Sequence, residues 1–291
     1  VNLNLMLDLP GHDPVAQWAP VVATTGDAEL FGARYGQATE GSAVRFLTFD
    51  EDNANSILRC VSQARDNARS VRDAISTELW EDLNAFYLDL KESARAGDLA
   101  PSPSAFFARI RRGSHLVKGV IDSTMSRTEG WHFARLGRLI ERADQTSRIL
   151  DVKYYMLLPR VEDVGGAIDE IQWAALLKSA SALEMYRKRF GLIRPEHVAD
   201  FLIFDRHFPR AIHYCLVDAE ASVHAITGSP WGTYRNEPEQ LLGRLRSELD
   251  YTRVDEVTTR GLHEFLDDLQ LRLNQIDDAI SKAFFSLPSE V

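Results

Sequence analysis

Charged residues at helical spacing between positions 138 and 148 are the group in this sequence best suited to chemistry. Arg138 lies three residues before Glu141 and four before Arg142, so on a helix these charged groups share one side. An arginine fork can hold the carboxylate or phosphate of a substrate, and a neighbouring glutamate can act as a base or bind an amine. We therefore treat Glu141 and Arg142 as hypothetical catalytic residues, and Arg138 and Arg148 as candidates for binding a substrate or a partner.

The same charges also have two structural interpretations. Along an exposed helix face, arginines and glutamates form weak intrahelical ion pairs that need no further role. Facing inwards, Glu141 and Arg142 could instead pair with counterparts on a related helix and fix how two central helices cross, at a cost in desolvation. The residues alone leave open whether this pair is catalytic or architectural.

A helix from residue 127 to residue 156 is predicted to carry these charges, because apolar residues recur there at helical spacing. Ser126 and Glu129 have the spacing of a capping box at its start. The same periodicity marks residues 75–94 and 262–284, and the sequence contains no convincing series of alternating strands. The sequence therefore predicts an all-α fold, a helical bundle.

A long stretch of the sequence occurs twice, 155 positions apart. Residues 17–69 align with residues 172–224 without a gap, and the phrase Phe-Leu-x-Phe-Asp that ends at Asp50 returns to end at Asp205. A repeat of this length indicates a duplicated half-domain rather than a solenoid of short units. We predict a bundle of two pseudo-symmetric tandem repeats that share one core. The predicted repeats span residues 1–125 and 126–291.

The first repeat lacks a counterpart of the helix that carries Glu141. Residues 1–10, "VNLNLMLDLP", resemble residues 151–159, "DVKYYMLLP", which directly follow that helix in the second repeat. Either the first helix was lost in evolution or about 30 residues before Val1 are missing from the chain. We favour the second explanation, because a half-repeat that opened in the middle of a helix would expose an apolar seam.

Asp50 and Asp205 end the repeated phrase and are candidates for contact with a substrate or a partner. Asp50 could cap a following helix over residues 52–72, whereas Pro209 would place the cap of the corresponding later helix at Phe208. Either aspartate could instead form a tertiary salt bridge with an arginine of the Glu141 helix, or contact a ligand. These alternatives stay open.

Arg34 and Arg189, and Trp18 and Trp173, also occupy matched positions of the two repeats. The arginines could add to an anion pocket or form surface ion pairs. The tryptophans could anchor the core or a helix interface, or stack on a nucleotide base, although no phosphate-binding loop adjoins them. All four are candidates for contact with a substrate or a partner.

Composition narrows the classes of partner. The 43 acidic and 33 basic residues give a net charge of −10, which argues against broad nucleic-acid binding. The sequence has no apolar run of about 20 residues for a membrane span and no secretory signal pattern. Its two cysteines, Cys60 and Cys215, are typical of a reducing compartment, and their matched positions predict small buried core residues. We expect a cytoplasmic protein that binds neither nucleic acid nor membrane.

No cofactor or metal is expected in the chain itself. The sequence contains neither a Walker-type phosphate loop nor a dinucleotide fingerprint, and no serine or cysteine nucleophile motif. Glu129 and His132 have the Glu-x-x-His spacing of carboxylate-bridged metal sites, but no second copy accompanies them. Any ATP chemistry therefore belongs to a partner.

The segment "LGRLIERADQTSRILDVKYYMLLP", with "EGWHFARLGRL" overlapping its start and "FLIFDRHFPRAIHYCL" further on, resembles the alpha-E family. That family is a predicted all-helical bacterial domain named for a Glu-Arg motif and usually found as a tandem duplication. The likeness covers essentially the whole chain. By resemblance, the motif maps onto Glu141 and Arg142, and its first copy would lie before Val1.

The resemblance also implies a setting. The family occurs in gene neighbourhoods with circularly permuted ATP-grasp ligases, transglutaminase-like proteins and an Ntn-hydrolase-type peptidase, which implies a role in peptide synthesis or modification. It implies the ATP-grasp ligase as a partner, with a transglutaminase-like protein as a further one, and assigns no reaction to this chain.

Three functional hypotheses follow. The leading one is an accessory or interaction subunit of an ATP-grasp-linked system, and the alternatives are an enzyme that transfers an amine or acyl group between the repeats and a purely structural module for homo-oligomerisation. An enzyme needs Glu141 in a partly desolvated cleft with a perturbed pKa. A scaffold would pair Glu141 fully and expose a large apolar patch.

Overall fold

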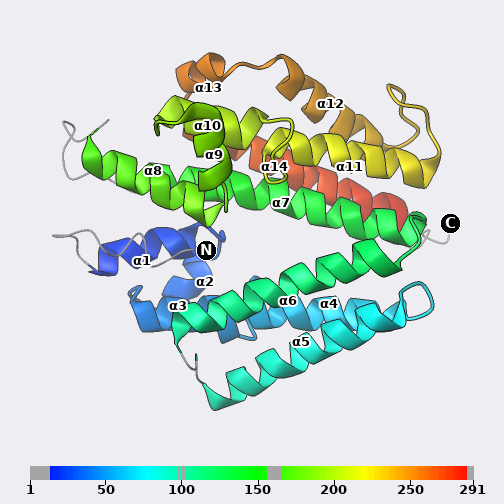
Figure 1. Ribbon diagram of the computed structural model, residues 1–291, viewed down its shortest axis with the longest axis horizontal. Coiled ribbons are helices and arrows are strands. Elements are labelled where there is room, and N and C mark those ends of the chain that lie inside the picture. Colours follow the sequence, from blue (N-terminus) through cyan, green and yellow to red (C-terminus); the bar gives the residue numbers. More distant parts are fainter. Residues whose placement is uncertain (1–13, 98, 100–101, 156–165, 287–291) are drawn as a thin grey trace. The chain divides into compact units, whose positions relative to one another are not determined.

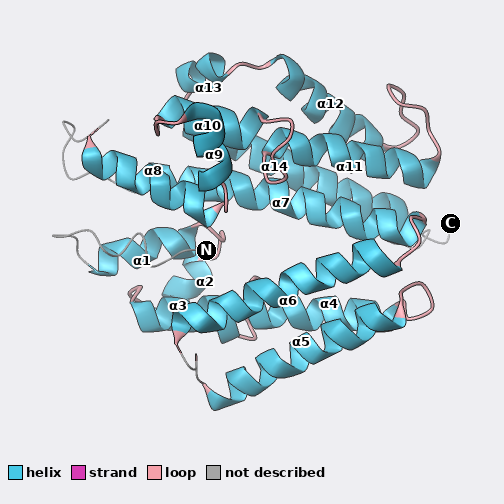
Figure 2. Cartoon of the chain, viewed as in Figure 1, coloured by secondary structure: helices cyan, strands magenta, loops and turns pink. Residues whose placement is uncertain are grey.

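The computed structural model describes residues 14–97, 99, 102–155 and 166–286, and the regular elements within these ranges are all helical (Figures 1 and 2). They comprise fourteen α-helices and one π-helical turn, and this part of the chain contains no strand. The prediction of an all-α fold is confirmed. Residues 1–10, whose sequence resembles that of residues 151–159, lie outside the described residues, as do residues 156–159.

The described residues form two compact units, Pro14–Trp131 and 132–286. We predicted that one repeat ends at residue 125, that the next begins at residue 126, and that the two share one core. These points remain predictions. The first unit contains α1 (Pro14–Ala23), α2 (Ala28–Tyr35), α3 (Glu40–Phe49), α4 (Ile57–Ser70), α5 (Thr77–Ala96) and α6 (Pro103–Thr124). α7 (Glu129–Tyr155) begins in the last residues of the first unit and continues into the second. The second unit also contains α8 (Ala167–Ser179), α9 (Leu183–Phe190), α10 (Pro195–Phe204), α11 (Ile212–Thr227), α12 (Glu237–Tyr251), α13 (Val254–Arg260), α14 (Leu262–Ile280) and the π-helical turn η3 (Ser281–Phe285).

Local sequence signals define the long helices of the first unit. The hydroxyl of Ser76 accepts a hydrogen bond from the Leu79 amide at the start of α5, and Ser102 caps α6 in the same way. Gly97 ends α5 in the left-handed conformation, which glycine adopts without strain. Between these helices and α4, Leu58, Leu90 and Phe106 form a buried apolar cluster. Caps and apolar spacing together thus position α4, α5 and α6.

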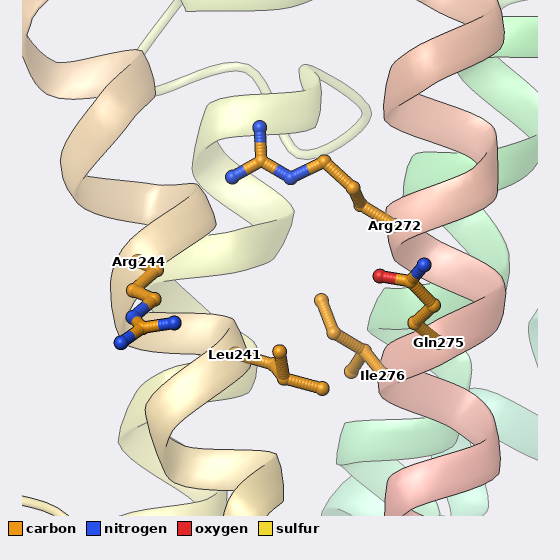
Figure 3. Close-up of a pocket in the computed structure, with 5 residues that line it drawn as sticks. All are labelled: Leu241, Arg244, Arg272, Gln275 and Ile276. Atoms are coloured by element: carbon orange, nitrogen blue, oxygen red, sulfur yellow. The ribbon is translucent and has the colours of Figure 1, made fainter.

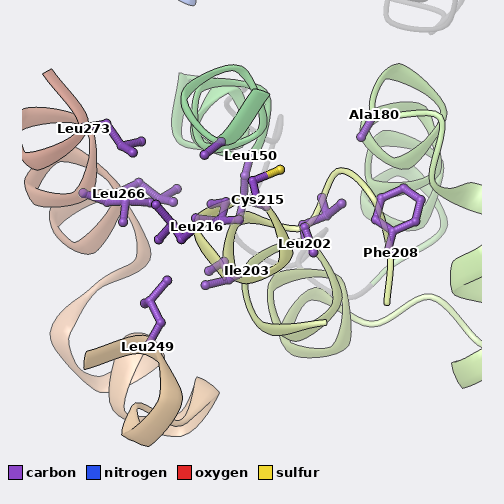
Figure 4. Close-up of a cluster of buried hydrophobic side chains, with 14 of the residues drawn as sticks. Leu150, Ala180, Leu202, Ile203, Phe208, Cys215, Leu216, Leu249, Leu266 and Leu273 are labelled. Carbon is purple, nitrogen blue, oxygen red and sulfur yellow. The ribbon is translucent and has the colours of Figure 1, made fainter. Parts of the chain in front are cut away.

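The second unit has the larger core, built around α7, α10, α11 and α14 (Figure 4). Leu150 of α7, Leu216 of α11 and Leu266 of α14 are fully buried in it. Cys215 is also fully buried, and burial raises the pKa of its thiol to about 12. This core holds one side of α7 in place and leaves its other side for polar residues.

The prediction of two buried cysteines is confirmed for Cys215 and wrong for Cys60, which is exposed. The thiol of each lies 3.6 Å from a backbone carbonyl six residues earlier. The difference lies in the surroundings, because α11 buries nine of its residues, Cys215 among them, whereas α4 buries only Leu58 and Ala68. The repeated sequence fixes local geometry but not burial.

Several elements recur at the spacing of the sequence repeat. α9, α10 and α11 begin 155 residues after α2, α3 and α4. Gly36 ends α2 at φ 69° and Gly191 ends α9 at φ 74°, a conformation that disfavours other residues. Each half also packs three aromatic rings together. The trios are Phe31, Tyr35 and Phe46, and Tyr186, Phe190 and Phe201.

The start of α7 differs from the prediction. The helix begins at Glu129, so Ser126 lies outside it and the predicted capping box is wrong. The carbonyl of Ser126 instead accepts a hydrogen bond from the Thr128 amide at 2.8 Å, in a turn that precedes the helix. This turn uses the residues that the pattern had assigned to the cap.

Among the described helices, none combines the length and the apolar character that a membrane crossing requires.

Candidate functional site

The charged face of α7 carries the residues that the sequence singled out. Leu136, Leu139 and Ala143 face the core, and Glu141 falls on the exposed side. The carboxylate of Glu141 accepts a hydrogen bond of 2.9 Å from the side-chain amide of Gln145, one turn further on. Glu141 therefore sits at the surface of a helix that is fixed from its other side.

Arg142 points from α7 towards the segment that precedes α11. Its guanidinium is half-buried and donates a hydrogen bond of 3.2 Å to the carbonyl of Pro209. One turn along α7, the hydroxyl of Thr146 donates to the carbonyl of Arg210 at 2.8 Å. Two side chains at i and i+4 of α7 thus hold two consecutive carbonyls, which fixes the start of α11 against the helix of Glu141.

Arg210 belongs to this site, and sequence reasoning missed it. Its guanidinium is half-buried, and within the described structure it forms neither a hydrogen bond nor an ion pair. Burial, and next the positive charge of Arg142, lower the pKa of Arg210. The position 155 residues earlier holds Asn55, so comparing the repeats gave no signal for it.

The other arginines of α7 have different surroundings. Arg148 forms an intrahelical ion pair with Asp144 at 2.6 Å, and Arg135 pairs with Asp218 of α11 at 2.6 Å. Arg138 is half-buried, and its charge is one of those that oppose the rise in the pKa of Cys215. Arg135 and Arg148 are thus paired with carboxylates, whereas Arg142 lies with Arg210 near the start of α11.

The capping alternative for Asp50 is wrong, and so is the expected cap at Phe208 in the later helix. Ser56 caps α4, and the cap position of α11 is Ala211 rather than Phe208. Asp50 and Asp205 instead end α3 and α10 and accept hydrogen bonds from backbone amides two residues further on, those of Asp52 and His207. Asp205 accepts a second one, from the Phe208 amide at 2.7 Å. The carboxylates thus shape the turns that connect helices.

Arg34 and Arg189 are the arginines nearest these carboxylates, and neither lies on α7. Arg34 lies 3.7 Å from Asp50 and 2.6 Å from Asp52, and Arg189 pairs with Asp205. Burial raises the pKa of Asp205, but the backbone amides and Arg189 outweigh it and hold that pKa below its usual value. Tyr35, a backbone amide and Arg34 lower the pKa of Asp50 against burial in the same way. The arginines are ion-pair partners of the repeated aspartates.

Trp18 and Trp173 are buried, at 4% and 5% exposure. Trp173 lies in the core of its unit, and the ammonium of Lys153 sits 5.4 Å from the centre of its ring. Lys153 also pairs with the buried Asp169 at 2.7 Å. These contacts match the core-anchor alternative for Trp173.

A groove in the second unit is a further feature that sequence reasoning missed. It has a volume of about 580 Å³ beside α12 and the loop that precedes it. A buried ion pair closes its floor, with Glu220 of α11 2.7 Å from Arg246 of α12. A smaller pocket between α12 and α14 adjoins it, where Leu241 and Ile276 point towards one another (Figure 3). Further lining residues of the groove are Tyr234, Glu239, Arg244 and Arg272.

Buried charges beside this groove are paired. Asp250 accepts from His213 at 2.8 Å and pairs with Arg246. Burial raises the pKa of Asp250, but these two hydrogen bonds outweigh it and lower that pKa. Within the described ranges, no group of three or more His, Cys, Asp and Glu side chains could hold a metal ion. The ion pairs that Arg246 forms with Glu220 and Asp250 join α11 to α12 beside the groove.

Comparison with known proteins places this geometry in a family. A family model named Alpha-E, described as a predicted alpha-helical domain with a conserved ER motif, matches residues 1–285. An uncharacterized protein of Mycobacterium bovis and two of Mycobacterium tuberculosis are each 24% identical to the chain over 263 residues, which cover 86% of the chain and 29% of the relative. The chain thus spans less than a third of the length of these relatives. No solved structure is significantly similar to it.

Proposed function

Because the chain belongs to the Alpha-E family, we propose that it is an accessory or interaction subunit of an ATP-grasp-linked peptide synthesis or modification system. In this proposal the Glu141–Arg142 face of α7 positions an acidic or peptidic group, or the partner itself. The supporting observation is the exposure of Glu141 on a helix whose neighbouring Arg142 is fixed to the Pro209 carbonyl. A rigid and accessible charged face suits recognition of another molecule.

The exposed position of Glu141 does not favour the enzyme alternative. A general base is usually tuned by burial and by neighbouring charges in a cleft. The Glu141 carboxylate is exposed and has the neutral Gln145 amide as its hydrogen-bond donor. Amine or acyl transfer is therefore the second candidate, and a purely structural role in oligomerisation is the third.

We also propose that the chain consists of two pseudo-symmetric tandem repeats. Three pairs of helices that start 155 residues apart support this proposal. So do two details that follow the same spacing, the glycines that end α2 and α9 and the arginine–aspartate pairs of Arg34 and Arg189. The second repeat then holds the Glu-Arg helix described above.

The length of the relatives is consistent with a modular role. In the mycobacterial relatives the matching stretch is 29% of a longer polypeptide. A domain that works beside other domains in one chain can also work beside a separate partner. ATP dependence of that partner would place the complex in the cytoplasm.

The test is purification of the chain with a circularly permuted ATP-grasp ligase, followed by analysis of ATP-dependent product. We expect the wild type and the control Glu184→Ala, which changes an exposed glutamate of α9, to support product formation. We expect Glu141→Ala to reduce it by about tenfold or more, since charge-assisted contacts are worth about 1.5–3 kcal/mol. Normal product with Glu141→Ala would refute the site, and the absence of both complex and ATP-dependent product would refute the accessory role.

A further inference from the structure

We propose that Arg142 and Arg210 form an anion-binding site that holds a phosphate group. The inference deepens the proposed function by naming the chemistry of the group that the Glu141–Arg142 face receives, and it rests on that function only for the source of the phosphate. Binding of the anion itself is a property of this chain.

Two side chains of α7 hydrogen-bond to consecutive carbonyls of the segment before α11. Arg142 donates to the carbonyl of Pro209 at 3.2 Å, and Thr146 donates to that of Arg210 at 2.8 Å. Arg210 is part of that segment, so its backbone is held one residue from the point where the Arg142 guanidinium is anchored. The backbone of Arg210, in the turn before α11, is therefore fixed beside Arg142, and its guanidinium lies within the electrostatic reach of Arg142.

The charges around Arg210 differ from those around other half-buried arginines of the unit. Several half-buried arginines elsewhere in the unit have carboxylate partners, among them Arg135, Arg148 and Arg246. Arg210 has none in the described structure, and the charged group that shifts its pKa most is another arginine. In a chain with a net charge of −10, two adjacent guanidinium groups without a carboxylate between them are an unfavourable arrangement unless an anion neutralises them.

The start of α11 offers further, weaker hydrogen-bond donors to an anion. In the first unit Ser56 caps α4, but the matched position before α11 is Ala211, which offers no side-chain acceptor. The first amides of α11 therefore lack a side-chain cap at the end of the helix where Arg210 lies. Water or a bound oxyanion can accept from them.

The number of charges selects the ligand class. Two guanidinium groups, each half-buried, repel one another. A carboxylate would neutralise one of these charges, whereas a phosphate dianion neutralises both and offers more oxygens to the two arginine forks. Inorganic phosphate and a phosphate ester share this chemistry, so the experiment compares both.

The experiment titrates the purified whole chain with inorganic phosphate and with phenyl phosphate by calorimetry, in the absence of any ligase. We expect both to bind, and Arg210→Gln to weaken binding by about tenfold or more because a charged hydrogen-bonding partner is lost. Arg187→Gln, which removes an exposed arginine of α9 in the same unit, is expected to leave binding unchanged. Tighter binding of the ester supports a phosphorylated molecule as the source, and tighter binding of the ion supports free phosphate.

Thermal unfolding without ligand separates a binding role from a structural one. Arg210→Gln keeps the backbone carbonyl that Thr146 holds and removes a repulsive charge, so we expect its melting temperature to equal or exceed that of the wild type. Phosphate should raise the melting temperature of the wild type and of Arg187→Gln only. The proposal is overturned if phosphate does not bind, if Arg210→Gln binds it normally, or if acetate competes as well as phosphate. If the wild-type chain does not bind phosphate but still supports the ligase, the accessory role stands and this inference alone is refuted.

Discussion

At the scale of single residues, the distinctive feature is a contact between positions far apart in the sequence. Arg142 reaches a carbonyl 67 residues away, and this places it beside Arg210. Spacing along a helix identified Arg142, because residues three and four apart share a face. Helical spacing could not identify Arg210, because the proximity of Arg210 to Arg142 depends on how α11 packs on α7.

The repeated aspartates show the same limit. Their recurrence singled out Asp50 and Asp205, and a tertiary salt bridge was one of the expected roles. The predicted arginine partners on α7 were wrong, since Arg34 and Arg189 occupy that place. Both arginines had been noted at matched positions, so pairing the matched residues with one another would have found the contact.

Asp205 gives a prediction for stability. Asp205→Ala leaves the amides of His207 and Phe208 without their acceptor in a partly buried turn, so the free energy of unfolding should fall by about 1–3 kcal/mol. Asp200→Ala is the control, because that carboxylate lies 3.8 Å from Arg189 and is more exposed. Urea denaturation of both variants measures the difference.

The loss of stability on Asp205→Ala should depend on pH. The pKa of Asp205 is lowered in the folded state, so its charge contributes fully above the unfolded value of about 3.9 and is lost as the pH falls through the lower folded value. The wild type and Asp205→Ala should therefore converge in stability below about pH 4. A difference that stays constant down to pH 2 would contradict this role for the ionised carboxylate.

At the scale of elements, the periodicity of apolar residues was sufficient to predict helices and insufficient to predict their ends. α7 starts at Glu129 because the preceding residues form a turn of their own, which competes with the capping pattern. Cys60 was assigned to the core from its match to Cys215, but α4 is covered on one face only. Helix ends and burial depend on neighbours that a single sequence does not specify.

Two glycines should respond oppositely to alanine. Gly191 ends α9 at φ 74° with open space around it, so Gly191→Ala should cost about 1 kcal/mol or more through backbone strain alone. Gly137 lies within α7, and an added methyl group meets nothing within 4 Å, so Gly137→Ala should stabilise by about 0.5–1 kcal/mol. Chemical denaturation measures both changes, and a loss of stability in Gly137→Ala would contradict the described surroundings of α7.

At the scale of the whole molecule, the described chain contains two compact units, and the later one carries the Glu141 helix, Arg210 and the groove beside α12. The local cationic pair of Arg142 and Arg210 is opposite in sign to the net charge of −10 of the chain. The helical class could be predicted from the sequence because patterning determines it. The groove could not, because it depends on how α12 and its preceding loop pack around Glu220.

The most direct test of the central claim, that the charged face of α7 is the functional centre, compares two double variants of equal net charge. Glu141→Ala with Arg142→Gln removes the face, and Glu184→Ala with Arg187→Gln removes an exposed pair of α9. The measurement is the rate of ATP-dependent product formation by the ligase in the presence of each variant. We expect the α7 double variant to lower that rate by about tenfold or more, as loss of charged contacts predicts, and the α9 double variant to match the wild type; equal rates for both double variants would contradict the claim.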